Sequence, residues 1–102
     1  MSKKTGALTL HLKEPWWSMI KSGEKTEEYR EIKYPYTSIF GNTPTELDRA
    51  FHTLEFCIGY PSRKDTERWI TFKNPKIRID YGKPEWGAQV NELYYVITWE
   101  RK

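Results

Sequence analysis

The chain has 102 residues, the size of one domain, which leaves no room for a separate regulatory or cofactor module. Leu, Ile, Val and Phe make up about a fifth of it, a level at which chains of high net charge stay disordered. The net charge is only +3, however, and five Trp and seven Tyr add large apolar surfaces. The composition therefore predicts one folded domain over residues 1–102.

Several classes of protein are disfavoured by the same composition. No apolar run approaches the ~20 residues of a transmembrane helix, and the polar start Met1-Ser-Lys-Lys has no hydrophobic segment behind it. We therefore expect a cytoplasmic protein without a membrane or an obligate protein partner. The single cysteine, Cys57, permits no internal disulfide, and with only His11 and His52 it cannot build a zinc site. We expect no metal and no cofactor, and a buried Cys57.

The first predicted elements are a strand and a short helix. Leucines alternate with polar residues over 8–12, which predicts a strand with its leucines facing the core and His11 facing away. Residues 14–23 favour a helix with Pro15 at its first position and Gly23 as a left-handed cap. Its buried face would carry Trp16, Met19 and Ile20.

The next stretch predicts a strand over residues 25–31. Alternation places Thr26, Glu28 and Arg30 on one face and Lys25 and Tyr29 on the other, and neither face is apolar. In the segment 34–50, Thr43 and Glu46 have capping-box spacing for a helix of about two turns over Leu47 and Ala50. A long ordered loop is the alternative there.

The remaining chain reads as strands separated by turns. The predicted strands cover residues 51–59, 67–73, 76–81 and 92–99, with Asn74-Pro75 and residues 82–87 as turns. The fold class is therefore α+β, mainly β. We expect a small barrel or strongly curved sheet with two or three short helices at its rim or end.

One segment, residues 22–30, concentrates charge at the start of what should be a core strand. Glu28 and Arg30 must be paired or solvated in a cleft if they face the interior, because an isolated buried charge costs several kcal/mol. Side chains at i and i+2 start roughly 7 Å apart, so they can meet or clamp one ligand. The alternative is an edge strand whose charges face water.

Residues 10–30 resemble the opening of ASCH domains, a family similar to the PUA RNA-binding barrels. The family signature is Gly-x-Lys-Thr-x-Glu-x-Arg, and every position of it is filled here by Gly23, Lys25, Thr26, Glu28 and Arg30. The strand ending at Gly59-Tyr60, the turn over 82–88 and the closing strand over 93–97 also look like small bacterial and phage members.

The resemblance implies a PUA-like β-barrel with a cleft between its first helix and the barrel. Members of the family are inferred to bind RNA or nucleotide-like ligands. By this likeness Lys25 would meet a phosphate or activate a nearby group. Glu28 and Arg30 would pair to hold the cleft or would read a base edge.

Aromatic residues at predicted turns are candidates for stacking on bases, because turn aromatics are less easily explained by the core. They are Tyr34, Tyr36, Tyr60 and Trp86. Arg63 and Lys64 follow Tyr60 in a loop, where they would contact phosphate or simply face water. We expect Trp16, Trp69, Phe72 and Trp99 to pack in the core instead.

Two alternatives to a binding domain remain open. Some ASCH proteins resemble amidohydrolases that act on acetylated cytidine with a Lys, a nucleophilic Thr and a distant Glu. Lys25 matches that Lys, but Glu28 stands where the Thr would be, and a carboxylate cannot supply alkoxide chemistry. Lys25 and Glu28 are thus the candidate catalytic residues, for this activity or for a ribonuclease. The other alternative is an interaction module whose motif charges only pair with each other.

Overall fold

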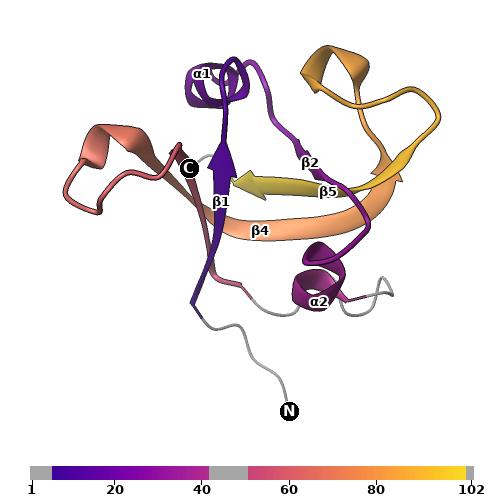
Figure 1. Ribbon diagram of the computed structural model, residues 1–102, viewed down its shortest axis with the longest axis horizontal. Coiled ribbons are helices and arrows are strands. Elements are labelled where there is room, and N and C mark those ends of the chain that lie inside the picture. The colour runs from indigo at the N-terminus through magenta and orange to yellow at the C-terminus, as the bar shows by residue number, and fades with distance from the viewer. Residues whose placement is uncertain (1–5, 42–50, 101–102) are drawn as a thin grey trace.

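The computed structural model describes residues 6–41 and 51–100 of the chain. Figure 1 labels the elements in chain order. They are β1 (Ala7–Leu12), α1 (Trp16–Ser22), β2 (Glu28–Arg30), α2 (Tyr36–Phe40), β3 (Thr53–Ile58), the 3-10 turn η1 (Thr66–Arg68), β4 (Trp69–Tyr81), the 3-10 turn η2 (Pro84–Trp86) and β5 (Leu93–Glu100).

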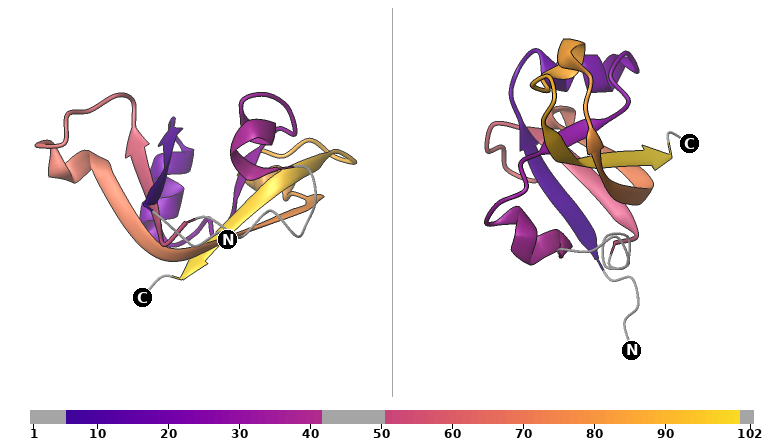
Figure 2. Two further views of the ribbon diagram at one scale, coloured as in Figure 1. Left: turned by 90° about the horizontal axis from the view of Figure 1, so that it is seen from below. Right: turned by 90° about the vertical axis from the view of Figure 1, so that its right-hand side faces the viewer.

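The strands form one mixed sheet in the order β1-β3-β4-β5-β2. β1 and β3 run parallel, and the other neighbours run antiparallel. Figure 2 shows the sheet curving into a trough, with β1 and β3 on one side and β5 and β2 on the other. The two helices lie toward opposite ends of this trough.

The fold is α+β and mainly β, as the alternating pattern predicts, but the sheet is open. Among the described residues the two edge strands, β1 and β2, are not paired with each other, so no closed barrel forms. β2 has only three residues, which offers few backbone groups to a second neighbour besides β5. The two edges are linked by Arg30 of β2, which donates a hydrogen bond to the His11 carbonyl of β1.

The core lies inside the trough. Leu8, Leu10 and Leu12 of β1 are each 4 % exposed, and His11 faces outward, as predicted. Each buried leucine contributes about 1.5–3 kcal/mol. Phe56 packs edge-on against Trp99 at 5.1 Å between ring centroids, so aromatic rings offset the scarcity of aliphatic residues. Phe72 and Trp99 stack at 5.1 Å, which confirms their packing role, and Cys57 is fully buried as expected.

β4 is one strand of 13 residues, where the sequence predicts two strands and a turn. At Asn74 the backbone takes φ 53°, and the register against β5 shifts between Lys73 and Lys76. Such a bulge bends a strand without ending it. The prediction of a turn at Asn74-Pro75 is therefore wrong, and the bulge lies within the long curve of β4 (Figure 2).

The segment 34–50 contains a helix that the sequence analysis did not predict. α2 covers Tyr36–Phe40, and Phe40 is buried against Tyr95 with ring centroids 5.0 Å apart. The Tyr95 hydroxyl donates a hydrogen bond of 2.8 Å to the Gly41 carbonyl, which anchors the end of α2 to β5. The helix predicted over Leu47 and Ala50 lies outside the described residues.

α1 lies within the predicted range 14–23, but it begins at Trp16, one residue after the predicted first position Pro15, and its buried face differs. Pro15 precedes the helix and Gly23 closes it at φ 93°, the left-handed conformation that glycine adopts without a Cβ clash. Trp17 and Ile20 are its buried residues, whereas Trp16 is only half-buried. The expectation that Trp16 packs in the core is therefore corrected, and its ring is available to the surface described next.

Candidate functional site

The residues of the Gly-x-Lys-Thr-x-Glu-x-Arg segment lie between α1 and β2. The Lys25 amide donates to the Met19 carbonyl at 2.9 Å, which ties the chain to α1 just after Gly23. The strand begins only at Glu28, so strand alternation does not govern Lys25. The prediction that Lys25 and Glu28 face opposite sides is wrong, because their side chains form an ion pair of 3.2 Å between Nζ and Oε1.

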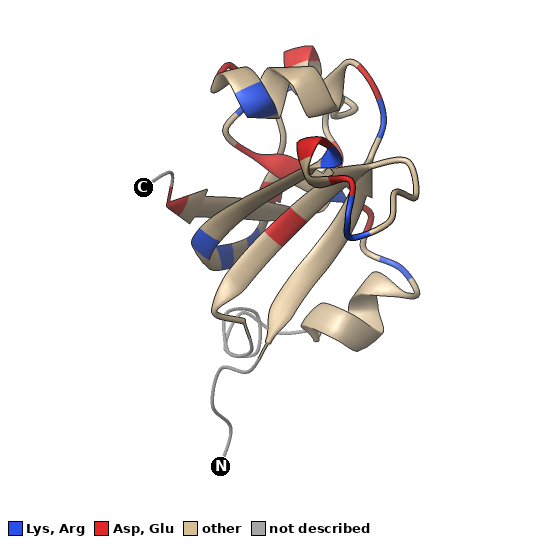
Figure 3. Cartoon of the chain, turned by 90° about the vertical axis from the view of Figure 1, so that its left-hand side faces the viewer, with Lys and Arg blue, Asp and Glu red and all other residues tan. Residues whose placement is uncertain are grey.

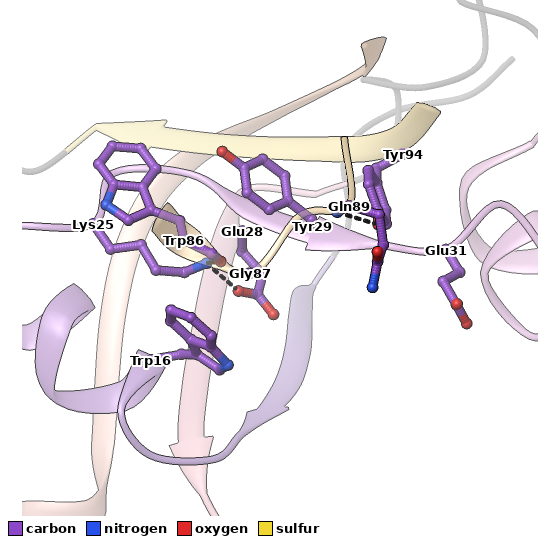
Figure 4. Close-up of a pocket in the computed structure, with 9 residues that line it drawn as sticks. All are labelled: Trp16, Lys25, Glu28, Tyr29, Glu31, Trp86, Gly87, Gln89 and Tyr94. Atoms are coloured by element: carbon purple, nitrogen blue, oxygen red, sulfur yellow. Dashed lines mark hydrogen bonds and ion pairs between the residues drawn. The ribbon is translucent and has the colours of Figure 1, made fainter. Parts of the chain in front are cut away.

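The Lys25 ammonium is almost completely buried, with 1 % of its side chain exposed. It donates to the Trp86 carbonyl oxygen at 2.9 Å and lies 5.0 Å and 4.9 Å from the ring centres of Trp16 and Tyr29 (Figure 4). Burial lowers the pKa of Lys25, and the Glu28 carboxylate opposes that shift. The ring faces and the two oxygen acceptors together hold a cation away from water.

The second half of the cluster is the pair between Glu28 and Arg30. Glu28 Oε2 accepts hydrogen bonds from Arg30 Nε at 3.0 Å and Nη2 at 2.7 Å. Arg30 Nη1 also donates to the Tyr36 hydroxyl at 3.0 Å, and Nη2 donates to the His11 carbonyl at 2.8 Å. The Arg30 guanidinium therefore joins β2 to α2 and to the opposite edge strand β1. In this structure it is engaged by these partners rather than free for a ligand.

Tyr29 lies between Glu28 and Arg30 on β2, and its hydroxyl is held by partners other than these two residues. Its hydroxyl donates to Glu27 at 2.8 Å and accepts from the Lys83 amide at 3.0 Å. Burial raises the pKa of this phenol, so it stays protonated over the physiological range. Gly82 and Ala88 lie beside the Tyr29 ring. A Cβ added to Gly82 would lie 2.9 Å from that ring.

Three adjoining hollows lie over this cluster, and we call them together the groove. The first has a volume of about 270 Å³ and is shown in Figure 4. It is lined by Trp16, Lys25, Glu28, Tyr29, Glu31, Trp86, Gly87, Gln89 and Tyr94. The second, of about 290 Å³, is lined by His11, Leu12, Lys13, Trp16, Glu28, Tyr29, Arg30, Glu31 and Tyr36. The third, of about 310 Å³, is lined by His11, Leu12, Lys13, Arg30, Tyr36, Gly59 and Tyr60.

The groove brings together most of the residues singled out from the sequence. Lys25, Glu28, Arg30, Trp86 and Tyr60 all line it, as does Tyr36. The walls are aromatic along its whole length, and its floor is the paired charge cluster. The segments that contribute these residues are far apart in the sequence, so only the curvature of the sheet makes them neighbours.

Three candidates do not line the groove. Arg63 instead pairs with Glu55 at 3.0 Å and lies over the Trp69 ring at 3.9 Å. Lys64 and Tyr34 are exposed outside the three hollows, Tyr34 with 76 % of its surface accessible. In the view of Figure 3 basic and acidic residues are interspersed over strands and loops, so no single basic face gathers on this side.

Other lining residues were not among the candidates from the sequence. They include His11, Lys13, Trp16, Tyr29, Gln89 and Tyr94. Lys13 is the most informative of them, because it is exposed and forms no ion pair with any described residue. The sequence does contain a signal for Lys13, because it directly follows the last leucine of β1, where the chain leaves the core. Its relation to Arg30 depends on tertiary structure.

Comparison of the chain with protein-family models, with curated proteins and with solved structures gives no match. Over residues 6–41 and 51–100, no three His, Cys, Asp or Glu side chains lie together as metal ligands would. In the same ranges no helix is long and apolar enough to cross a membrane. The chemistry of the groove must therefore be argued from its own geometry.

Proposed function

We propose that this chain binds RNA or a nucleotide-derived ligand in the groove, as a PUA-like domain of the ASCH family. The observation that carries the proposal is a groove walled by the rings of Trp16, Trp86 and Tyr60 above a buried charge cluster. Single-stranded nucleic acid is bound by stacking its bases on such rings and by meeting its phosphates with cations.

The motif residues support the proposal through what they build. Lys25, Glu28 and Arg30 neutralise one another in part and leave the local cluster with one excess positive charge. Their pairing positions α1, β2 and β1 around the groove. The family assignment rests on the five matched motif positions together with a curved sheet and a helix between its first and second strands.

The test is binding of a fluorescein-labelled, mixed-sequence RNA octamer, followed by fluorescence anisotropy at several salt concentrations. We expect salt-dependent binding by the wild type. Trp86→Leu keeps the backbone carbonyl that Lys25 uses and removes the ring, so affinity should fall at least fivefold, the lower end of about 1–3 kcal/mol per stacked base. Trp69→Leu is the matched control, since Trp69 lies under Arg63 away from the groove.

Two results would contradict the proposal. One is a wild type that shows no salt-dependent binding to the octamer. The other is an equal loss of affinity in Trp86→Leu and Trp69→Leu at unchanged thermal stability, because the groove would then have no special part in binding.

A hydrolase acting on a modified nucleoside or on RNA is the second candidate. One observation favours it: burial lowers the pKa of Lys25, and this amine lines the first hollow. Thr26, however, is exposed and lines none of the three hollows, so no threonine hydroxyl lies in the groove beside Lys25. Glu28, the other candidate catalytic group, is engaged by both cations.

Incubation with N4-acetylcytidine, with cytidine release followed by chromatography, separates the two candidates. We expect no turnover. Turnover by the wild type that is lost in a folded Lys25→Met variant would replace the binding proposal with the hydrolase.

A further inference from the structure

We propose that the groove contains two base subsites, so that its ligand is a single strand of at least two nucleotides rather than a lone nucleotide. This inference rests on the proposed function and specifies the ligand. The first subsite is the first hollow, which Trp16 and Trp86 both line. The second is an aromatic shelf made by Tyr60 and His11 at the far end of the third hollow.

The shelf is built to present one ring face to solvent. Tyr60 is 89 % exposed, yet its ring packs on the His11 imidazole with centroids 4.4 Å apart and planes inclined by 36°. His11 Nδ1 lies 2.8 Å from the Gly59 carbonyl, so in the tautomer that donates there the shelf is tied to the end of β3. A ring supported on one side and open on the other is the platform on which an unpaired base stacks.

The second hollow connects the two subsites. It shares Trp16, Glu28 and Tyr29 with the first hollow and His11, Arg30 and Tyr36 with the third. A strand that crosses here passes over the Glu28–Arg30 pair. Every guanidinium nitrogen of Arg30 already donates to Glu28, Tyr36 or the His11 carbonyl, so we assign the phosphate at this crossing point to another cation.

Lys13 is that cation. It lines both the second and the third hollow, is exposed, and has no ion-pair partner within the described ranges. Lys25, by contrast, is 1 % exposed and held by Trp86 and Glu28. Glu31 is the acidic residue on the rim of the second hollow, and its charge is balanced by Lys33 at 2.8 Å.

The test compares ligand lengths by isothermal titration calorimetry. The probes are the four nucleoside 5′-monophosphates and the four homopolymeric RNA tetranucleotides. We expect the wild type to bind the preferred tetranucleotide at least tenfold more tightly than its monophosphate. Tyr60→Ala should remove most of that advantage and leave monophosphate affinity within about twofold. Tyr34→Ala, an exposed tyrosine outside the groove, should change neither.

A second variant tests the phosphate contact separately. Lys13→Ala should reduce the salt dependence of tetranucleotide binding by a slope of about 0.7, the value for one contact on a single strand. The control Lys76→Ala, on an exposed position of β4 outside the groove, should leave the slope unchanged.

The outcomes distinguish the inference from the proposed function. If monophosphates and tetranucleotides bind equally well, or if Tyr60→Ala weakens both alike, the two-subsite inference is overturned while nucleotide binding stands. If the wild type binds none of the probes, the proposed function fails, and the inference fails with it.

Discussion

Lys25 is the residue whose surroundings depart most from the ordinary. Removing an ammonium from water costs several kcal/mol, and here the cost is offset by Glu28, the Trp86 carbonyl and two ring faces. Among the described residues, no buried side-chain polar atom lacks a hydrogen-bond partner, so the charged cluster is internally complete. Its role is to set the shape of the groove, and contact with ligand is left to the rings and to Lys13.

Replacing Lys25 should change how stability depends on pH. The folded chain holds the pKa of Lys25 below its ordinary 10.5, so between that lowered pKa and 10.5 the unfolded chain binds more protons. Stability contributed by this residue therefore rises with pH across that window. The Lys25→Met variant lacks this pH-dependent contribution to stability. The wild type minus variant difference in free energy of unfolding should grow as pH rises toward 10.5 in urea titrations.

Tyr29, the half-buried phenol next to this site, has the opposite effect on how stability depends on pH. Its pKa is raised, so it adds stability below its ordinary 10.0 that is lost as pH rises further. It is present in both chains, so its contribution largely cancels in the difference. Parallel pH profiles for wild type and Lys25→Met would contradict the prediction.

At the scale of elements, the groove depends on how closely η2 approaches α1. Gly87 ends η2 at φ 104°, and a Cβ there would lie 3.0 Å from the Trp16 ring. Trp86, one residue earlier, supplies both a ring to the wall and the carbonyl that Lys25 uses. A glycine is needed at this position both for its backbone conformation and for the space beside the tryptophan.

Gly87→Ala should therefore lower stability by about 1–2 kcal/mol and shift the Trp16 ring. The measurements are thermal unfolding and the Trp16 indole N–H resonance in a ¹⁵N-correlated spectrum. Gly6→Ala is the matched control, because Gly6 also has a positive φ of 68° but nothing lies within 4 Å of its added Cβ. The control should lose stability and leave the Trp16 resonance in place. An unmoved Trp16 in Gly87→Ala would refute the packing argument.

At the scale of the whole molecule, the side chain of Arg30 links the two edges of the open sheet. Arg30 on β2 hydrogen-bonds the His11 carbonyl on β1 and the Tyr36 hydroxyl on α2. Residues that are distant in sequence are joined by this link, which lies at the floor of the groove. The distance between the groove walls should therefore change when these Arg30 hydrogen bonds are lost.

Arg30→Met keeps the aliphatic stem and removes every donor. We expect the free energy of unfolding to fall by about 3 kcal/mol, because Glu28 keeps its ion pair with Lys25 but loses its shorter ion pair, the one with Arg30. Amide hydrogen exchange should accelerate more in the edge strands β1 and β2 than in the inner strands β4 and β5. Arg78→Met is the control: Arg78 pairs with Glu27 and Asp80 but is 47 % exposed, so the expected loss is below about 1 kcal/mol. Uniform acceleration over all strands would count against Arg30 as the link.

Local patterns predicted much of this protein. The leucines of β1 follow from period-two alternation, the glycine at the end of α1 from cap chemistry, and the closing strand β5 from its β-branched and aromatic content. All three signals act over a few neighbouring residues. The same patterns failed at Asn74, where a bulge and a turn share residue preferences, and at Trp16, where a shift of one position changes the helix face.

The sequence by itself determined that Glu28 and Arg30 need compensation if they face the interior, because buried charge is costly in any fold. It left an edge strand with solvated charges as the alternative, and the burial of Lys25 came only from the structure. Only the tertiary structure decided how these charges are compensated: β2 starts late enough for Lys25 to reach Glu28, and the bent sheet brings His11 and Tyr36 to Arg30. It also decided that, of the described cations that line the groove, Lys13 remains available to a ligand. The physical reason is that pairing depends on distances between segments far apart in the chain, and no local preference encodes those distances.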